Sequence, residues 1–312
     1  LEVGHSVRTL AQSVHEAEQD VTVATNLMES RLLTGPPELF QALREATGPD
    51  NIWPSQRFFE AKREEQKRRY QKYDDTVSNL EPNVKESPGG LRDIHTIGWV
   101  AKRNLGADTM NDLVMHGLLT KDEYLDLMAG QEYMWRIRFA LHVVTGRGQD
   151  RLLFDLQREL AVMFGYRDDD QGLAVEKFMQ LYYQTALRLS RMNEMLLQLF
   201  QEAIVFKFHL DEPKLITDLF QSRSGYLEVV DEGVFKRHPL ALLQIFLILA
   251  QHQELNGVRA KTIRLIRRHR HLINEEFRTR DAARWIFMVI LRVPQGFTHA
   301  LRLMNRYGIF ER

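Results

Sequence analysis

The chain has 312 residues, of which 44% are hydrophobic, so it can bury a full core and has room for about two domains. Its 42 basic and 42 acidic residues give a net charge of zero, so overall charge gives no argument for nucleic acid as a partner. It has no cysteine, which excludes disulfides and thiolate metal sites and is compatible with a cytoplasmic location, and its longest apolar run, residues 240–250, is far shorter than the ~20 residues of a membrane-spanning helix.

The N-terminal region leaves its secondary structure partly open. Residues 1–8 alternate as the end of a strand would, which predicts a short strand there. Residues 15–33 contain several β-branched side chains that are compatible with either strand or helix. Residues 39–46 are predicted to form a short helix, because Pro36 and Pro37 suit a helix start.

Residues 54–72 are predicted to form a strongly charged helix. Its basic residues alternate with Glu60, Glu64 and Glu65 at spacings that allow i,i+4 ion pairs, which is typical of a solvated face. A phosphate or partner site is the alternative interpretation. The basic residues are Lys62, Arg63, Lys67, Arg68, Arg69 and Lys72.

Residues 82–93 are the most informative stretch of the chain. Pro82 and Pro88 bias the residues before them away from helix. The pair Gly89-Gly90 lets the backbone take positive φ or approach a ligand closely. A helix is predicted directly after the glycines, because apolar residues recur there at helical spacing: Leu91, Ile94, Ile97 and Val100.

This arrangement allows two interpretations of the start of that helix. Lys85 and Arg92 would lie near the helix N-terminus, where unpaired N–H groups and the macrodipole favour an anion. The simpler interpretation is a glycine turn that opens an ordinary helix, with Asp93 as an acidic first-turn partner of the dipole. The spacing alone leaves both open.

The rest of the chain is predicted to be helical apart from one hairpin. Long helices at 121–144, 152–164 and 173–206 joined by short loops are typical of a bundle. Residues 219–235 are predicted to form a β-hairpin around Ser224-Gly225. Four shorter helices are expected after the hairpin, at 238–251, 258–271, 279–292 and 296–305.

Three polar groups outside the glycine motif are further candidates for binding sites. The basic stretch 264–271 lacks interleaved aromatic residues, which favours a surface helix over a nucleic-acid site. His142 has no second histidine or carboxylate at i±4, which favours a core or capping histidine over a metal ligand. The aspartates at 168–170 are expected to lie in a solvated loop.

Residues 85–100, Lys-Glu-Ser-Pro-Gly-Gly-Leu-Arg-Asp-Ile-His-Thr-Ile-Gly-Trp-Val, resemble the "KE-x-PGGLRDI-x-TIGWVA" segment of bacterial PII-protein uridylyltransferases. Residues 1–9, 20–33, 135–142 and 193–200 are similar to other segments of that family, in the same order. The resemblance is close as far as Phe200 and looser beyond.

Members of that family combine a nucleotidyltransferase core, a helical region, an HD phosphohydrolase domain and two ligand-sensing domains. The resemblance implies that residues 1–35 are the tail of the core with a remnant strand, 36–210 a helical bundle, and 211–312 a smaller α domain with the hairpin. The expected fold class is therefore mainly α, with two packed helical subdomains that meet near 211–213. The core's Gly-Ser turn with an Asp-x-Asp pair and the His-Asp motif of the HD domain are not recognisable in the sequence, so a central fragment without catalytic residues or metal ligands is expected.

The resemblance also implies an activity for the parent enzyme. Such an enzyme transfers UMP from UTP to a tyrosine of the PII signalling protein with Mg²⁺, removes it again, and responds to glutamine. The fragment alone is expected to be structural, inactive and without bound Mg²⁺ or UTP. The candidate nucleotide- or phosphate-binding residues are Lys85, Gly89, Gly90, Arg92 and Arg8, with Asp93 as a candidate for orienting Arg92.

Two alternatives to this interpretation remain. Glutamine synthetase adenylyltransferases are similar in the Gly-Gly-x-x-Asp-Ile helix, but continue with Glu-Phe where this chain has His95-Thr96. The other alternative is a non-catalytic helical module that binds other proteins.

Overall fold

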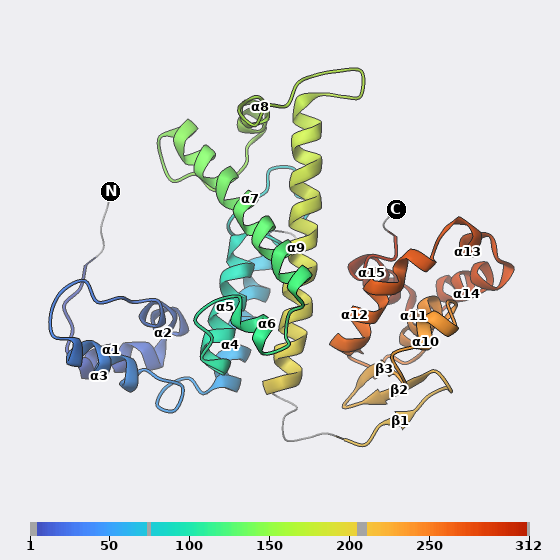
Figure 1. Ribbon diagram of the computed structural model, residues 1–312, viewed down its shortest axis with the longest axis horizontal. Helices are drawn as coiled ribbons and strands as arrows, with labels where there is room; N and C mark the ends of the chain where they lie inside the picture. The colour runs from blue at the N-terminus through green and yellow to red at the C-terminus, as the bar shows by residue number, and fades with distance from the viewer. Residues whose placement is uncertain (1–4, 74–75, 205–210, 311–312) are drawn as a thin grey trace. The chain divides into compact units, whose positions relative to one another are not determined.

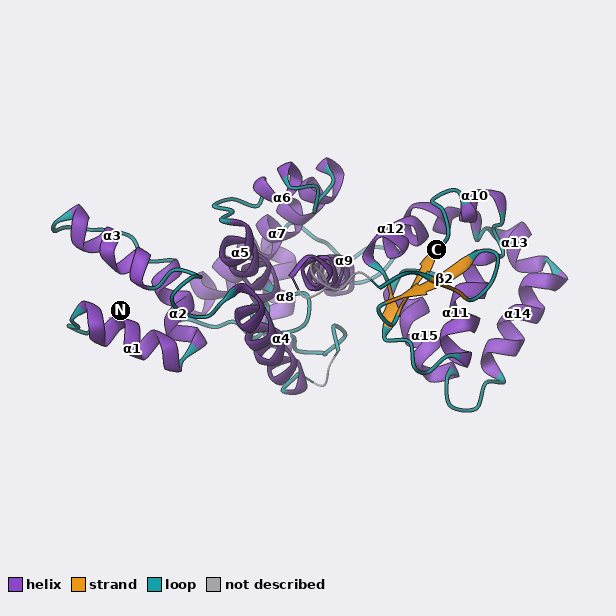
Figure 2. Cartoon of the chain, turned by 90° about the horizontal axis from the view of Figure 1, so that it is seen from below, coloured by secondary structure: helices purple, strands orange, loops and turns teal. Residues whose placement is uncertain are grey.

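The computed structural model describes residues 5–73, 76–204 and 211–310 (Figure 1). The chain forms two compact units, Leu1–Phe200 and Gln201–Arg312. Both are mainly helical and the strands lie in the second (Figure 2), which confirms the predicted fold class. The finer division at residues 35 and 210 stays a prediction. None of the helices in the described ranges is long and apolar enough to cross a bilayer.

The first unit begins with a small helical cluster of α1 (Leu10–Gln19), α2 (Val21–Met28) and α3 (Pro37–Ala46). The segment 15–33, which the sequence left open between strand and helix, is thus helical up to Met28 apart from Asp20, and residues 29–33 form neither helix nor strand. Thr9 starts α1 with a capping box, and Asp20 caps α2 by accepting from the Thr22 amide, which satisfies N–H groups that no helical carbonyl reaches.

The predicted N-terminal strand is not found in the part of it that the structure describes. Residues 1–4 lie outside the described residues, and residues 5–9 form no strand. Helix α1 packs instead on α2 and α3. A small apolar core of Ala17, Ala24 and Ile52 holds this cluster together.

The remainder of the first unit is a bundle of longer helices. The helices are α4 (Ser55–Gln71), α5 (Leu91–Leu105), α6 (Asp112–Met115), α7 (Lys121–Thr145), α8 (Phe154–Met163) and α9 (Ala174–Ile204). Gly130 lets α7 approach α9 closely, because an added Cβ there would lie 2.8 Å from Leu189 Cδ2 of α9.

Helix α4 differs from the prediction of a solvated charged helix. Phe58, Lys62, Gln66 and Arg69 follow one another at spacings of four, four and three, and all four side chains are buried. This stripe faces α5, because α4 and α5 pack along their length. The charges on it are retained because polar groups of the same unit pair with them, as described below.

The second unit contains a small mixed sheet in the order β1-β2-β3-β4. The predicted hairpin is confirmed, with Ser224 and Gly225 both at positive φ in its turn (50° and 78°). The sheet is nevertheless larger than the expected hairpin, since β1 pairs antiparallel with β2 and β4 pairs parallel with β3. The strands are β1 (Lys214–Leu215), β2 (Phe220–Arg223), β3 (Tyr226–Val229) and β4 (Gly257–Val258).

The helices of the second unit pack around α11, which is apolar on almost every face. Helices α14 and α15 make its main contacts. The four predicted helices are confirmed to within a few residues, while α10 and α13 are one-turn elements that the pattern did not predict. The bounds are α10 (Val234–Arg237), α11 (Ala241–Gln251), α12 (Ala260–His269), α13 (Glu275–Thr279), α14 (Asp281–Leu291) and α15 (Phe297–Arg306), with a 3₁₀ turn η1 (Arg270–Leu272).

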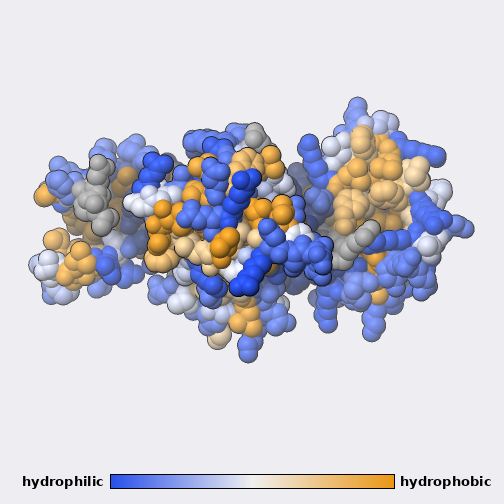
Figure 3. All heavy atoms as spheres, turned by 90° about the horizontal axis from the view of Figure 1, so that it is seen from above, coloured by the Kyte–Doolittle hydropathy of each residue, from blue (hydrophilic) through white to orange (hydrophobic). Residues whose placement is uncertain are grey.

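Both units also expose apolar side chains. Figure 3 shows patches of hydrophobic side chains between hydrophilic ones on one face of the molecule. In the first unit Trp135, Phe139 and Val143 of α7 are 50%, 72% and 56% exposed, and in the second unit Trp285 of α14 is 65% exposed. Patches of this kind are candidates for contacts with other proteins or domains.

Candidate functional site

The loop before α5 is closed by its own hydrogen bonds. The Asn83 side chain accepts from the amides of Lys85 (3.0 Å) and Glu86 (2.8 Å), and the Ser87 hydroxyl accepts from the Asn83 amide (2.9 Å). The Val84 amide donates to the carbonyl of Asp150 at 2.9 Å, which fixes the loop to the chain after α7. The loop is therefore rigidly positioned by short polar side chains.

The two glycines serve close packing of the protein itself. Gly89 has φ +77°, and a Cβ there would overlap the carbonyl of Ala186 in α9. A Cβ at Gly90 would lie 2.9 Å from three carbonyl oxygens of the preceding loop. Of the two roles considered for the glycine pair, Gly89 takes the positive φ, and at both positions protein backbone occupies the space where a Cβ would lie.

The amides at the start of α5 are also used within the protein. The amide of Gly89 donates to the Asp93 carboxylate at 2.7 Å, and those of Gly90, Leu91 and Arg92 donate to loop carbonyls at 2.8–3.0 Å. A helix N-terminus binds anions through unpaired N–H groups, and these are paired. An anion at this point would have to be held by side-chain charge.

Asp93 is fully buried and accepts four hydrogen bonds. Their donors are the Arg69 guanidinium (2.6 Å), the Tyr70 hydroxyl (2.6 Å), the backbone amide of Gly89 (2.7 Å) and the side-chain amide of Gln66 (3.3 Å). Burial, reinforced by the Asp93 charge, raises the pKa of Tyr70 well above its ordinary value. Asp93 thus joins α4 to the glycine loop, and no described contact supports the expected role in orienting Arg92.

Lys85 and Arg92 are brought together by a shared carboxylate. Glu86 Oε1 lies 3.1 Å from Nη2 of Arg92 and 3.7 Å from Nζ of Lys85, and about a quarter of each side chain is exposed. The three groups carry a net charge of +1 near the surface. Arg8 lies exposed before α1, and no contact between described residues joins it to this group.

A second ion-pair group adjoins the first and was missed in the sequence. Asp150 Oδ1 accepts from Arg138 Nε at 2.7 Å and lies 3.0 Å from His142 Nε2. Burial alone would raise the pKa of Asp150, but the hydrogen bonds from Arg138 and His142 and the charge of Lys85 hold it below its ordinary value. His142 is therefore a hydrogen-bond partner of Asp150 rather than a core or capping histidine. Its partner lies eight residues further along, beyond the end of the helix.

Trp99 connects α5 to α4 and to the end of α2. The buried ammonium of Lys62 lies 4.6 Å from the centre of the Trp99 ring, and the guanidinium of Arg92 lies 5.4 Å from it. Burial lowers the pKa of Lys62, although an ion pair with Glu65 at 2.8 Å opposes this effect. The indole N–H of Trp99 donates to Glu29 at 2.6 Å.

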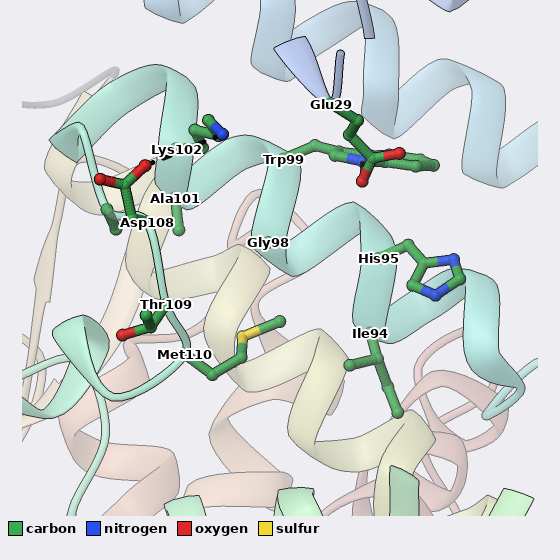
Figure 4. Close-up of a pocket in the computed structure, with 11 residues that line it drawn as sticks. Glu29, Ile94, His95, Gly98, Trp99, Ala101, Lys102, Asp108, Thr109 and Met110 are labelled. Atoms are coloured by element: carbon green, nitrogen blue, oxygen red, sulfur yellow. Dashed lines mark hydrogen bonds and ion pairs between the residues drawn. The ribbon is translucent and has the colours of Figure 1, made fainter. Parts of the chain in front are cut away.

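A pocket of about 200 Å³ opens beside Trp99 (Figure 4). Arg92, His95 and Trp99 lie on one face of α5 at spacings of three and four, and the rings of His95 and Trp99 are 5.9 Å apart. Burial, with the charge of Arg92 nearby, lowers the pKa of His95, which favours the neutral imidazole. The residues that line the pocket are Glu29, Ile94, His95, Gly98, Trp99, Ala101, Lys102, Ala107, Asp108, Thr109 and Met110.

The described residues offer no evident metal site. Nowhere within them do three or more His, Cys, Asp or Glu side chains lie together as metal ligands would. The aspartates at 168–170 are in an exposed loop, as expected. Asp169 pairs there with Lys177.

The chain is similar to known proteins in both of its units. Residues 57–197 match the family model "GlnD PII-uridylyltransferase", and residues 220–312 match "Uridylyltransferase GlnD third domain". Proteins called bifunctional uridylyltransferase/uridylyl-removing enzyme are similar along the chain: that of Azotobacter vinelandii is 49% identical over 312 residues, that of Pseudomonas aeruginosa 50% over 315, and that of Methylococcus capsulatus 53% over 309.

These matches cover 99–100% of this chain. The chain spans 35% of the length of each of these relatives. No solved structure gave a significant match. The two family models and the identity along the whole chain together show that the chain belongs to the GlnD uridylyltransferase family.

Proposed function

We propose that this chain is the central helical part of a bifunctional uridylyltransferase/uridylyl-removing enzyme, and that its first unit helps to hold UTP. The parent enzyme would transfer UMP from UTP to a tyrosine of the PII protein and remove it again. The observation that carries the proposal is the pair of partly exposed cations, Lys85 and Arg92, held at one carboxylate.

The chemistry of nucleotidyl transfer explains what these cations would do. Negative charge increases on the leaving pyrophosphate as the bond to the α-phosphorus breaks, and nearby cations stabilise it. In the free protein Glu86 neutralises one of the two charges. A triphosphate carries more negative charge than Glu86, so it can replace this carboxylate as the partner of Arg92 and Lys85.

The metal that the family resemblance implies does not fit this part of the enzyme. A Mg²⁺ ion for phosphoryl-group chemistry needs oxygen ligands such as a carboxylate pair, and no suitable group occurs in the described ranges. The carboxylates nearest to the cations, Glu86 and Asp150, are each engaged with basic side chains. We therefore assign Lys85 and Arg92 to the triphosphate, and none of the residues that the structure describes to the metal.

The other partners follow from the same proposal. PII would be the protein substrate and glutamine a regulator of the complete enzyme, and a cytoplasmic location agrees with the absence of cysteine. The alternative of an adenylyltransferase for glutamine synthetase is disfavoured by the family matches over both units.

One observation favours a protein-binding role beside the nucleotide role. Trp135, Phe139 and Val143 repeat every four residues along α7, and each is at least half exposed. A stripe of this kind is typical of a helix face that contacts another protein or domain. Its replacement by polar residues should weaken the use of PII without changing the use of UTP.

The experiment that tests the proposed function is UTP-dependent labelling of PII by the complete enzyme. Lys85→Ala and Arg92→Ala should each raise the UTP concentration needed for half-maximal rate. Arg63→Ala is the matched control, because Arg63 is an exposed residue of α4. The 312-residue chain alone should show no Mg²⁺-dependent transfer of UMP to PII, and measurable transfer by it would contradict the proposal.

A further inference from the structure

Gly98 lies in the middle of α5, where glycine is unfavourable relative to alanine. At Gly89 and Gly130 of the first unit, glycine is required because backbone or a branched side chain fills the space where a Cβ would lie. A Cβ at Gly98 would approach only the terminal methyl group of Met110, at 3.2 Å. Packing alone therefore does not require glycine here, and its effect is to leave the pocket beside Trp99 open.

The pocket has the composition of a small ligand site. Its walls include the apolar side chains of Ile94, Ala101 and Met110, and its polar groups include Glu29 and Lys102. Figure 4 shows that these come from α5, the end of α2 and the segment before α6. Ligand sites are commonly apolar with a few polar groups that fix orientation. A volume of about 200 Å³ suits one planar ring rather than a whole nucleotide.

The polar groups include both an acceptor and donors. Glu29 Oε1 accepts from Trp99, and its second oxygen has no hydrogen-bond partner among the residues that the structure describes. Lys102 Nζ lies 3.8 Å from Asp108, too far for a hydrogen bond, so its N–H groups remain available. Neutral His95 offers one ring N–H.

This combination complements uracil better than cytosine. The uracil ring presents one N–H donor and two carbonyl acceptors, and the pocket lining offers both a carboxylate acceptor and N–H donors. Cytosine presents a lone pair where uracil presents that N–H, and a carboxylate such as Glu29 would repel it. A site built to accept one hydrogen bond discriminates strongly against a ring that lacks it.

The pocket also lies at a suitable distance from the cations. Gly98 follows Arg92 by six residues, which is roughly 9 Å along the helix axis at 1.5 Å per residue. Arg92, His95 and Trp99 form a continuous face between them. A ribose and its first phosphate can span such a distance.

We propose that this pocket binds the pyrimidine ring of a uridine nucleotide, with Glu29 selecting uracil over cytosine and Lys85 and Arg92 at the phosphate end. The inference rests on the proposed function, which supplies UTP as the nucleotide. It adds a ring-binding site and a residue that determines base specificity.

The test is ligand-observed saturation-transfer NMR on the complete chain, with uridine, cytidine and inorganic triphosphate as separate probes. Uridine should bind more tightly than cytidine. Gly98→Leu fills the pocket and should weaken uridine binding by roughly tenfold, the effect of a misfitting group in a small pocket. Ala129→Leu adds the same side chain to the exposed surface of α7 and should leave uridine binding unchanged.

Glu29→Gln is the second variant, and it guards against an effect on folding. Glutamine still accepts the hydrogen bond from Trp99, so thermal melts should be unchanged. Its amide can also donate to cytosine, so the preference for uridine over cytidine should fall by roughly tenfold. An unchanged preference, or uridine binding that Gly98→Leu does not weaken, would overturn the ring site.

Inorganic triphosphate separates this inference from the proposed function. Lys85→Ala with Arg92→Ala should weaken triphosphate binding and leave uridine binding intact. Loss of the ring site with triphosphate binding preserved would contradict the pocket inference alone. The opposite result would contradict the role of the cations and leave the pocket standing.

Discussion

Arg69 of α4 and Asp93 of α5 form an ion pair at 2.6 Å, in which Asp93 is fully buried and Arg69 only 8% exposed. A buried carboxylate needs such partners to offset the loss of hydration. Arg69 also donates to the carbonyl of Glu86 at 2.7 Å. The pair therefore links α4 to the glycine loop and to the backbone of Glu86, whose carboxylate holds Lys85 and Arg92.

Asp93→Asn should destabilise the protein strongly. The substitution removes the close counter-ion of the buried Arg69 guanidinium and leaves only Glu86 Oε2, at 4.0 Å from Arg69 Nε. Loss of one partner of a buried pair costs about 3–5 kcal/mol. The measurement is the free energy of unfolding in urea. If Asp93 were only an exposed partner of the helix dipole, its replacement would lower the free energy of unfolding by a smaller amount, about 0.3–1 kcal/mol.

Asp155→Asn is the matched control for that prediction. Asp155 is also an acidic residue in the first turn of a helix, α8, but it is exposed. Its loss should cost about 0.3–1 kcal/mol through the helix dipole. Equal effects at Asp93 and Asp155 would show that the buried pair contributes nothing beyond the dipole.

Lys62 should make stability depend on pH in the alkaline range. Burial lowers its pKa below the ordinary 10.5, so between the lowered value and 10.5 the unfolded chain binds more protons than the folded chain. The contribution of Lys62 to the free energy of unfolding therefore rises with pH between its lowered pKa and 10.5. In Lys62→Met this rise should disappear, as measured by unfolding free energies from neutral pH upward.

The difference between wild type and Lys62→Met isolates the lysine. Buried tyrosines such as Tyr70, whose raised pKa acts in the opposite direction, are common to both proteins. Parallel pH profiles for the two proteins would show that Lys62 titrates in the folded state as it does in water.

Gly89→Ala should prevent stable packing of the glycine loop on α9. Positive φ costs a non-glycine residue roughly 1–2 kcal/mol, and the new methyl group would overlap the Ala186 carbonyl, an overpacking that adds about 1–3 kcal/mol. Gly146→Ala is the control, because Gly146 has φ +64° with no atom near the added Cβ. Thermal melts should show the larger loss for Gly89→Ala, and similar losses at both positions would contradict the close contact.

Much of the fold could be predicted because local patterns determine it. Helix α3 begins at Pro37 as the proline pair indicated, and the hairpin turns at Ser224-Gly225. Strand β4 could not be predicted, since two residues carry no periodicity and its parallel partner β3 lies far away in the sequence.

The site was harder to predict because its contacts cross between elements. The face of α4 that carries Lys62 and Arg69 looked solvated, since charged residues at helical spacing usually face water. Phe58 and Phe59 near the start of that helix were the available signal that one face is buried. The partner of His142 was missed because Asp150 lies beyond the end of α7, outside the i±4 positions that a helix brings together.

The central claim is that Lys85 and Arg92 bind the triphosphate of UTP, and the most direct measurement is UTP-dependent labelling of PII by the complete enzyme with both replaced by alanine. The account predicts weaker use of UTP, by about 1.5–3 kcal/mol for each charge-assisted contact. Thermal melts should barely change, because partly exposed ion pairs contribute little to stability. Unaltered labelling by the double variant would contradict the claim and leave this segment a structural turn.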